Sequence, residues 1–408
     1  MDKKVVRAWC FYDFGNSAFA VLFTAIFSVY YQDIIVGGKD GIFWWGLTIS
    51  LSMAAVAISS PFMGGIADHA GIRKRMLAIY TALGIVAVLG FTQLDAGMAV
   101  AGFAIALVAN FAFEGGVVFY NAYLPEIAPA SHHGRVSAWG FAVGYVGSLL
   151  ALVIAVAVFE ISMTLVWIAL AVQWAIGATP ALLFLPKDKP GGMTVAAAAR
   201  KGFRQTATTI RSVIRMPNLR RFLIGYFFYI DGVNTVIAMA SVYASKELNF
   251  ETSELFMLFG VVQLSALAGS MAMAKPTDAK GPKWAVQWSL VWWILVVLAA
   301  FFAETKGVFW GVAVLAGLGL GSIQAASRAF MSRLIPKGRE AELFGFYALC
   351  GKSGAILGPV LFGTLAKIFE SQRPAILTVA VFYIIGLVFL RKVKEEATDL
   401  DSASGASD

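Results

Sequence analysis

The stretch FYDFGNSAF, residues 11–19, returns in altered form as FYIDGVNTV, residues 228–236, and this repeat decides the fold. Both stretches contain the pattern D-x-x-N-[ST] inside a long apolar run, at an offset of 218 residues. On a helix, three polar residues with this spacing lie on one face. The side chains concerned are Asp13, Asn16 and Ser17 in the first copy and Asp231, Asn234 and Thr235 in the second.

These two polar faces predict a cavity between two halves of a membrane protein. A carboxylate at the centre of a bilayer costs about 3 kcal/mol or more unless it faces protein, water or a partner. Polar stripes at matching places in two halves are typical of secondary transporters with internal repeats. For Asp13 and Asp231 two roles stay open: coupling or binding in the cavity, or the bridging of neighbouring helices.

The composition predicts an all-α integral membrane protein. The 408 residues are 59% hydrophobic and 14% charged, whereas soluble proteins carry about 25% charged residues. The apolar runs are continuous and do not alternate, so helices are the expected spanning structure. Twelve runs are long enough to span a bilayer: 9–32, 43–67, 76–95, 98–124, 136–159, 161–185, 222–245, 254–274, 284–303, 307–332, 343–369 and 372–390.

The charge distribution predicts the topology. With both termini cytoplasmic, 25 of the 32 Lys and Arg residues fall in inner segments and five in outer loops. Inner loops of membrane proteins carry this excess of basic residues. The net charge of +8 is therefore assigned to topology and to anionic lipid headgroups, and no nucleic-acid partner is expected.

A basic segment divides the chain into two six-helix halves. We expect an N-terminal bundle over 1–185, a cytoplasmic linker over 186–221, a C-terminal bundle over 222–390 and a disordered cytoplasmic tail over 391–408. The linker is either a surface-lying amphipathic helix or a solvated tether. Cys10 and Cys350 fall in apolar runs and are expected to pack there as free thiols.

A second repeat lies in two predicted inner loops. GGIADHAGIRKR (residues 64–75) and AKPTDAKGPK (residues 274–283) share D-x-x-G-x-[RK] at an offset of 210 residues. The carboxylate is expected to accept hydrogen bonds at the start of a neighbouring helix and to pair with a loop arginine. The glycines would permit close packing and a tight turn, with a purely structural turn as the alternative. The residues of this predicted conformational latch are Gly64, Asp68, Gly71, Arg73, Lys74, Asp278, Gly281 and Lys283.

The first of these loops resembles the loop signature of the major facilitator superfamily. That resemblance implies two pseudo-symmetric bundles that rock about a central site, and a latch that stabilises the outward-open state. The second loop departs from the signature, because Ala274 replaces its first glycine.

Three further segments resemble the branch that contains the fungal vacuolar effluxer of autophagy and its bacterial relatives. They are YDFGNSAF (12–19), YLPEIAP followed by GRVSAWGFAVGYVG (123–147), and GSIQAASRAFMSRLIPKGREAELFGFYALCGKSGAILGP (321–359). This resemblance covers nearly the whole chain and implies export of small solutes, which are amino acids in the fungal case.

Other polar residues lie within the predicted spans. Asn110 and Glu114 are four residues apart, and Glu114 lies near mid-span as a candidate proton-binding group or as half of a salt bridge. Gln324 and Arg328 have the same spacing, and Arg328 would either hold an anionic group of a substrate or reach the membrane surface. Lys352 is expected to pair with Asp231 or Asp13.

These features together predict a secondary transporter rather than an enzyme. The first choice is proton-coupled export of a small polar solute, such as an amino acid or similar zwitterion, by a monomer in the inner (plasma) membrane. Facilitated diffusion or uptake is the alternative, and a non-transporting sensor or assembly partner is a third. The sequence has no P-loop and no His spacing suited to a metal, so neither metal nor cofactor is expected.

Overall fold

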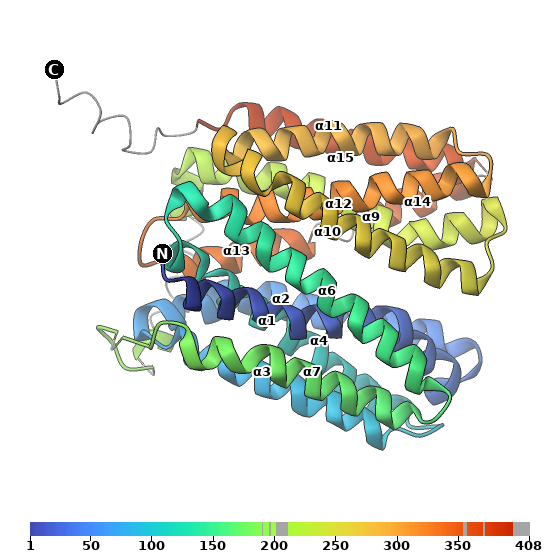
Figure 1. Ribbon diagram of the computed structural model, residues 1–408, viewed down its shortest axis with the longest axis horizontal. Coiled ribbons are helices and arrows are strands. Elements are labelled where there is room, and N and C mark those ends of the chain that lie inside the picture. Colours follow the sequence, from blue (N-terminus) through green and yellow to red (C-terminus); the bar gives the residue numbers. More distant parts are fainter. Residues whose placement is uncertain (190, 196, 201–210, 354–356, 370–371, 395–408) are drawn as a thin grey trace.

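Helices running along one common direction make up the computed structural model (Figure 1). The structure describes residues 1–408 except 190, 196, 201–210, 354–356, 370–371 and 395–408. Within the described residues, eleven helices are long and apolar enough to cross a membrane. Large apolar side chains such as those of Ile42, Ile58 and Val156 are exposed on the outside of the bundle, as expected for contact with lipid.

The N half consists of six long helices with short connecting turns. The first helix continues into two π-helical segments, η1 and η2, so the first span is longer than an α-helix alone. The bounds are α1 Lys3–Leu22, η1 Phe23–Phe27, η2 Tyr30–Val36, η3 Gly38–Asp40, α2 Gly41–Ala70, α3 Arg73–Gly90, η4 Phe91–Gln93, α4 Ala99–Asn121, α5 Leu124–Ile127, η5 Ala130–His132, α6 His133–Phe159 and α7 Met163–Phe184.

The C half has the corresponding set of helices. Its bounds are α9 Pro217–Leu248, α10 Thr252–Lys280, α11 Pro282–Phe301, α12 Lys306–Leu334, α13 Glu340–Ser353, α14 Leu357–Ile368 and α15 Gln372–Arg391. The run predicted over 343–369 is described as the two shorter helices α13 and α14, and residues 354–356 between them lie outside the described residues. Several helices extend beyond the predicted apolar runs because their charged ends continue the helix, as at the end of α10.

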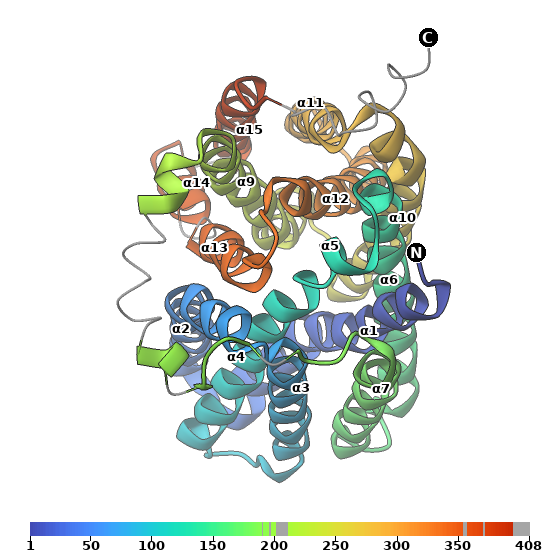
Figure 2. The ribbon, with the colours of Figure 1, turned by 90° about the vertical axis from the view of Figure 1, so that its left-hand side faces the viewer.

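The two halves meet along a few helix pairs (Figure 2). Within the N half α1 packs against α6 and α7, and within the C half α9 packs against α15. Between the halves, α2 packs against α13, while α6 packs against α10 and α12. The start of α1 and the end of α15 lie at the same end of the molecule, which is called the termini end below (Figure 1).

Two glycines predicted to make turns have the required backbone. Gly71 follows α2 with φ +65°, and Gly281 separates α10 from α11 with φ +86°. An L-residue adopts such angles at a cost, so glycine suits both positions. Cys10 and Cys350 are both free, as expected. Of the predicted linker, residues 211–215 are helical, and 201–210 lie outside the described residues, as does most of the predicted tail.

Candidate functional site

A cavity of about 500 Å³ lies between the two halves and is partly open. In the N half it is lined by α1 with η1, α4 and α6, and in the C half by residues from α9 to α15. It extends from Asp13 toward the end opposite the termini, where Thr24 and Phe309 line it. Eight of the predicted cavity residues line it: Asp13, Asn16, Ser17, Glu114, Thr235, Gln324, Arg328 and Lys352.

Three predicted cavity residues lie elsewhere. Asp231 is fully buried in the C half, and both of its carboxylate oxygens accept from the backbone N–H of Gly358, at 3.0 and 2.9 Å. Asn110 donates to Ser52 Oγ at 2.7 Å and so joins α4 to α2. Asn234 is half-buried on α9 and is not among the lining residues. The repeated motif therefore faces the cavity fully only in its first copy.

Four charged side chains line the cavity, and they form two ion pairs that we call the charged floor. In the first pair, Lys352 Nζ lies 2.5 Å from Glu114 Oε1. This pairing corrects the expectation that Lys352 contacts Asp231 or Asp13. The physical reason is that Asp231 is bound at the start of α14, whereas Glu114 on α4 faces α13 across the cavity. The Glu114 side chain is 11% exposed and that of Lys352 is 25% exposed.

The second pair of the charged floor is more deeply buried. Arg328 Nη1 lies 3.5 Å from Asp13 Oδ2, and the side chains are 3% and 8% exposed. Arg328 also donates to Ser137 Oγ at 2.9 Å, to the Ser137 carbonyl at 2.7 Å and to Asn121 Oδ1 at 3.3 Å. Its guanidinium lies 4.1 Å from the Phe141 ring centroid. Arg328 lies on α12 in the C half, yet its guanidinium is held almost entirely by groups of the N half.

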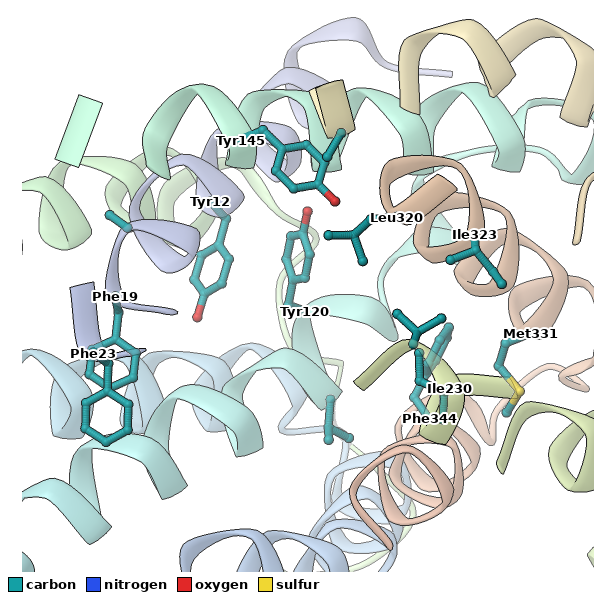
Figure 3. Close-up of a cluster of buried hydrophobic side chains, with 14 of the residues drawn as sticks. Tyr12, Phe19, Phe23, Tyr120, Tyr145, Ile230, Leu320, Ile323, Met331 and Phe344 are labelled. Atoms are coloured by element: carbon teal, nitrogen blue, oxygen red, sulfur yellow. The ribbon is translucent and has the colours of Figure 1, made fainter. Parts of the chain in front are cut away.

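Two tyrosines complete the polar surroundings of the second pair. Tyr120 donates to Asp13 Oδ2 at 3.0 Å, and Tyr145 donates to Gln324 Oε1 at 2.9 Å. Figure 3 shows the two hydroxyl groups pointing toward one another, with Leu320 beside them. The Tyr145–Gln324 bond is a further contact between the halves, since it joins α6 to α12.

Two buried polar atoms on the cavity wall have no hydrogen-bond partner among the residues that the structure describes. They are Asn16 Oδ1, on a residue that is 3% exposed, and Trp293 Nε1, on a residue that is 1% exposed. Buried polar groups are usually paired, so each is a candidate contact for a bound molecule. Asn16 belongs to the N half and Trp293 to the C half.

At the termini end, the first predicted latch joins the halves. Asp68 on α2 accepts from the backbone N–H groups of Ala341 and Glu342, at 3.2 and 2.9 Å, at the start of α13. It also pairs with Arg73 at 2.8 Å, and Arg73 in turn contacts Glu340 at 2.9 Å. The N-terminus of a helix favours a carboxylate, so the contact of Asp68 with the start of α13 is electrostatically favourable. Asp68 thus makes the two contacts that its loop motif predicts.

Close packing accompanies the first latch. A Cβ on Gly64 would overlap the Ala341 backbone, so only glycine permits this approach of α2 and α13. Lys74 has a different role from the one expected, because its ammonium donates to the Leu185 carbonyl at 2.8 Å within the N half.

The second predicted latch makes the equivalent contact from the C half. Asp278 on α10 accepts from the backbone N–H groups of Gly134 and Arg135, at 2.8 and 3.3 Å, at the start of α6. It also pairs with the Arg135 side chain at 2.5 Å. Lys283, by contrast, donates to the Val393 carbonyl at 2.6 Å within the C half. Each half thus inserts one aspartate at a helix start of the other half.

Several residues of the site were missed by sequence reasoning. Tyr120, Asn121, Ser137 and Tyr145 are polar residues in predicted spans or at their ends, yet their types are also common at helix interfaces without function. Helical spacing is the pattern that could have identified some of them, since Ser137 and Tyr145 lie eight residues apart on one face of α6. Among the described residues, no group of three or more His, Cys, Asp or Glu side chains could hold a metal ion.

Comparison with known sequences shows similarity to transporters. The model of a family described as "Vacuole effluxer Atg22 like" matches residues 45–401. The uncharacterized MFS-type transporter YxiO of Bacillus subtilis is 29% identical, over 97% of this chain and 96% of the relative. Autophagy-related protein 22-1 of Penicillium rubens is 21% identical, over 92% of this chain and 81% of the relative.

Comparison with solved structures shows the same fold. The human organic anion transporter MFSD10 superimposes with a TM-score of 0.77 at 14% identity, covering 95% of this chain and 99% of that one. A bacterial homologue of the iron transporter ferroportin, in an outward-facing state, gives a TM-score of 0.72 at 16% identity, with 96% and 98% covered. At these identities the likeness concerns the fold alone.

Proposed function

The chain belongs to the Atg22-like vacuole effluxer family of major facilitator transporters, and on that premise we propose that it exports a small zwitterion in exchange for protons. The cargo is an amino acid or a molecule with the same charged head. Transport proceeds by alternating access in a monomer, with the two halves rocking about the cavity. We place the protein in the inner (plasma) membrane, although the family description refers to the vacuole.

The charged floor carries this proposal. In both of its ion pairs the acid belongs to the N half and the base to the C half: Asp13 with Arg328, and Glu114 with Lys352. Separating the halves would break both pairs and leave buried charges without partners, which is strongly unfavourable. A zwitterion supplies the missing partners, because its ammonium group suits the acids of one half and its carboxylate suits the bases of the other.

Of the two pairs, Glu114–Lys352 is the better candidate for exchange with substrate and protons. Its side chains are more accessible than those of Asp13 and Arg328, and it has fewer competing hydrogen bonds. In an exchange mechanism the proton and the cargo bind in turn: ionised Glu114 holds the ammonium group of the cargo while Lys352 holds its carboxylate, and protonation of Glu114 releases the cargo and leaves no unpaired carboxylate behind. This alternation couples proton binding to cargo binding at one place.

The present conformation supports an outward-open state of this cycle. The latch carboxylates Asp68 and Asp278 join the halves at the termini end, while the cavity reaches toward the opposite end. With the termini assigned to the cytoplasm by the distribution of basic residues, the cavity faces outward.

The test is transport into proteoliposomes that contain a pH-sensitive dye. If a panel of amino acids is added outside, proton exchange makes the lumen more alkaline as cargo enters. Acidification would indicate symport instead, and accumulation without a pH change would indicate facilitated diffusion. If no zwitterion accumulates or exchanges, the transport of zwitterions is refuted and a sensor role becomes the better hypothesis.

A matched pair of variants tests the assignment of the proton to Glu114. Glu114→Gln should retain exchange of labelled cargo across the membrane, with weaker binding of its ammonium group, but lose the pH change, because an amide side chain does not exchange a proton as a carboxyl group does. Glu160→Gln, at an exposed position beyond the end of α6, is the control and should behave as the unmodified protein. A Glu114→Gln protein that still moves protons would refute the assignment.

A further inference from the structure

The cavity is lined differently by the two halves. In the N half its lining comes from α1 with η1, α4 and α6, and no residue of α3 or α7 contributes. In the C half it continues between the helices and reaches α11, α14 and α15. We call this extension the C-half annex; it is defined by Trp293, Val296, Val297, Phe362, Ile376 and Val379.

Aromatic side chains explain why the N half has no equivalent space. Trp174 of α7 lies 5.1 Å from Phe19 and 6.4 Å from Phe113, measured between ring centroids, and fills the space between α1, α4 and α7. At the offset of the repeated motif, Phe19 corresponds to Ile237 on α9, a smaller side chain without a ring. The cavity therefore reaches between the helices of the C half, whereas in the N half the aromatic rings occupy the corresponding place.

The annex is apolar, whereas the rest of the cavity has a charged floor. All six residues that define the annex are at most 9% exposed, and five of them have no side-chain hydrogen-bonding group. The sixth, Trp293, has an indole N–H that meets no hydrogen-bond acceptor within the described ranges. A buried water needs two to four polar partners, so water is a poor occupant of this space.

The size of the cavity also exceeds what a small amino acid needs. Its volume of about 500 Å³ falls within the range of about 300–1,000 Å³ that is typical of pockets for drug-sized ligands. A molecule the size of alanine at the charged floor would leave the annex empty. An apolar group attached to the same charged head would fill it.

We infer that the C-half annex is a subsite for the apolar tail of a zwitterionic amphiphile. The charged head lies at the charged floor, where the unpaired Asn16 Oδ1 accepts from its ammonium group, and the tail passes between α9 and α12 into the C half. This inference rests on the proposed function for the position of the head. It adds that the cargo has a tail longer than the side chains of the standard apolar amino acids.

A ligand series with one head group tests the subsite. Straight-chain 2-amino acids with side chains of one to eight carbons are titrated into the full-length protein in lipid nanodiscs, and the heat of binding to empty nanodiscs is subtracted. Burial of one methylene is worth about 0.8 kcal/mol, which corresponds to a gain of about fourfold in affinity. We expect this gain to continue beyond four side-chain carbons, so the eight-carbon ligand should bind at least a hundredfold more tightly than the four-carbon ligand.

Two substitutions of the same kind on α15 locate the tail. Val379 is 2% exposed and lines the annex, whereas Val381 is 52% exposed on the outside of the same helix. Val379→Phe should reduce the affinity for the eight-carbon ligand by tenfold or more and leave that for alanine unchanged. Val381→Phe should change neither.

Phe362→Ala provides the opposite change if Val379→Phe does not fold. Removing the Phe362 ring enlarges the annex, so the affinity should keep rising with chain length where that of the unmodified protein has stopped rising. Unchanged length dependence in this variant would place the tail elsewhere and overturn the inference.

The outcomes separate this inference from the proposed function. If alanine and all longer ligands bind equally well, the annex is not a tail subsite, while the zwitterion carrier stands. If no member of the series binds or is transported, the assignment of a zwitterionic head is refuted, and the amphiphile falls with it.

Discussion

Arg328 is the residue on which the contact between the halves depends most. It comes from the C half, yet its guanidinium contacts Asp13, Asn121 and Ser137, all in the N half. A guanidinium presents several donors in a fixed plane, so one side chain can satisfy several acceptors at once. The sequence suggests Arg328 as an anion-binding group, but in the structure it pairs with Asp13. Lys352 is therefore the more accessible base of the cavity.

Removal of Arg328 should destabilise the protein strongly. In Arg328→Met, Asp13 loses its ion-pair partner while still buried, and breaking a buried pair in this way costs about 3–5 kcal/mol. We expect a lowered thermal unfolding temperature, and partial recovery in the double variant Asp13→Asn with Arg328→Met. Arg75→Met, at an exposed position, is the control. If Arg328→Met and Arg75→Met unfolded at the same temperature, this account would be contradicted.

Two buried asparagines should respond in opposite ways to the same substitution. Asn16 Oδ1 has no partner in the described part of the chain, whereas Asn110 donates to Ser52 Oγ. Asn16→Ala should weaken cargo binding with little effect on unfolding. Asn110→Ala should lower stability by about 1–3 kcal/mol because Ser52 loses a hydrogen bond, and should leave cargo binding unchanged. Calorimetric titration and thermal unfolding of both variants decide between these patterns.

At the scale of the helices, Asp231 shows how one motif serves two purposes. Its copy in the N half faces the cavity, but Asp231 accepts from the first turn of α14 at Gly358. The two copies of the motif thus place their carboxylates in different surroundings. Lys352 of α13 pairs with Glu114 in the cavity, whereas Phe362 of α14 lines the annex.

A methyl group at Gly358 should disrupt this helix start. A Cβ there would overlap Thr235 Oγ1 and lie 2.9 Å from Asp231 Oδ1, so Gly358→Ala must displace α14. A Cβ on Gly363, in the same helix, meets nothing within 4 Å. We expect Gly358→Ala to lower the unfolding temperature and Gly363→Ala to raise it slightly, since alanine favours a helix over glycine by about 1 kcal/mol. Similar effects of the two substitutions would show that the close approach is not important.

At the scale of the whole molecule, the two halves are joined at the termini end by equivalent but separate contacts. Asp68 binds the start of α13 and Asp278 binds the start of α6. Each contact pairs a carboxylate with a helix N-terminus and an arginine, and both must break if the halves rotate apart. Together with the charged floor, they join the halves in the present conformation.

Loss of both latch carboxylates should shift the conformational equilibrium. In the double variant Asp68→Asn with Asp278→Asn, spin labels at Arg75 and Lys337, one in each half at the termini end, should show a larger population of long distances. Asp95→Asn, near the end opposite the termini, is the control and should leave the distance distribution unchanged. An unaltered distribution in the double variant would mean that other contacts hold this end closed.

The fold and the family could be predicted from the sequence because both rest on local information. Apolar runs of bilayer length, the duplicated D-x-x-N-[ST] stripe and the D-x-x-G-x-[RK] loops indicate two helical halves and the position of the first latch. The latch aspartate was predictable as well, because a carboxylate is stabilising at a helix N-terminus whichever helix supplies it.

Which charges meet could be decided only by the tertiary structure. Asp13 and Asp231 occupy the same motif, yet one pairs with Arg328 and the other binds the start of α14. Lys352 is joined to Glu114, 238 residues away in the chain, and not to either expected aspartate. The sequence determines which residues lie on one helix face, since that follows from the helical repeat. The partner of each face depends on how the helices pack, where side-chain volumes such as that of Trp174 leave one half filled and the other with the space of the C-half annex.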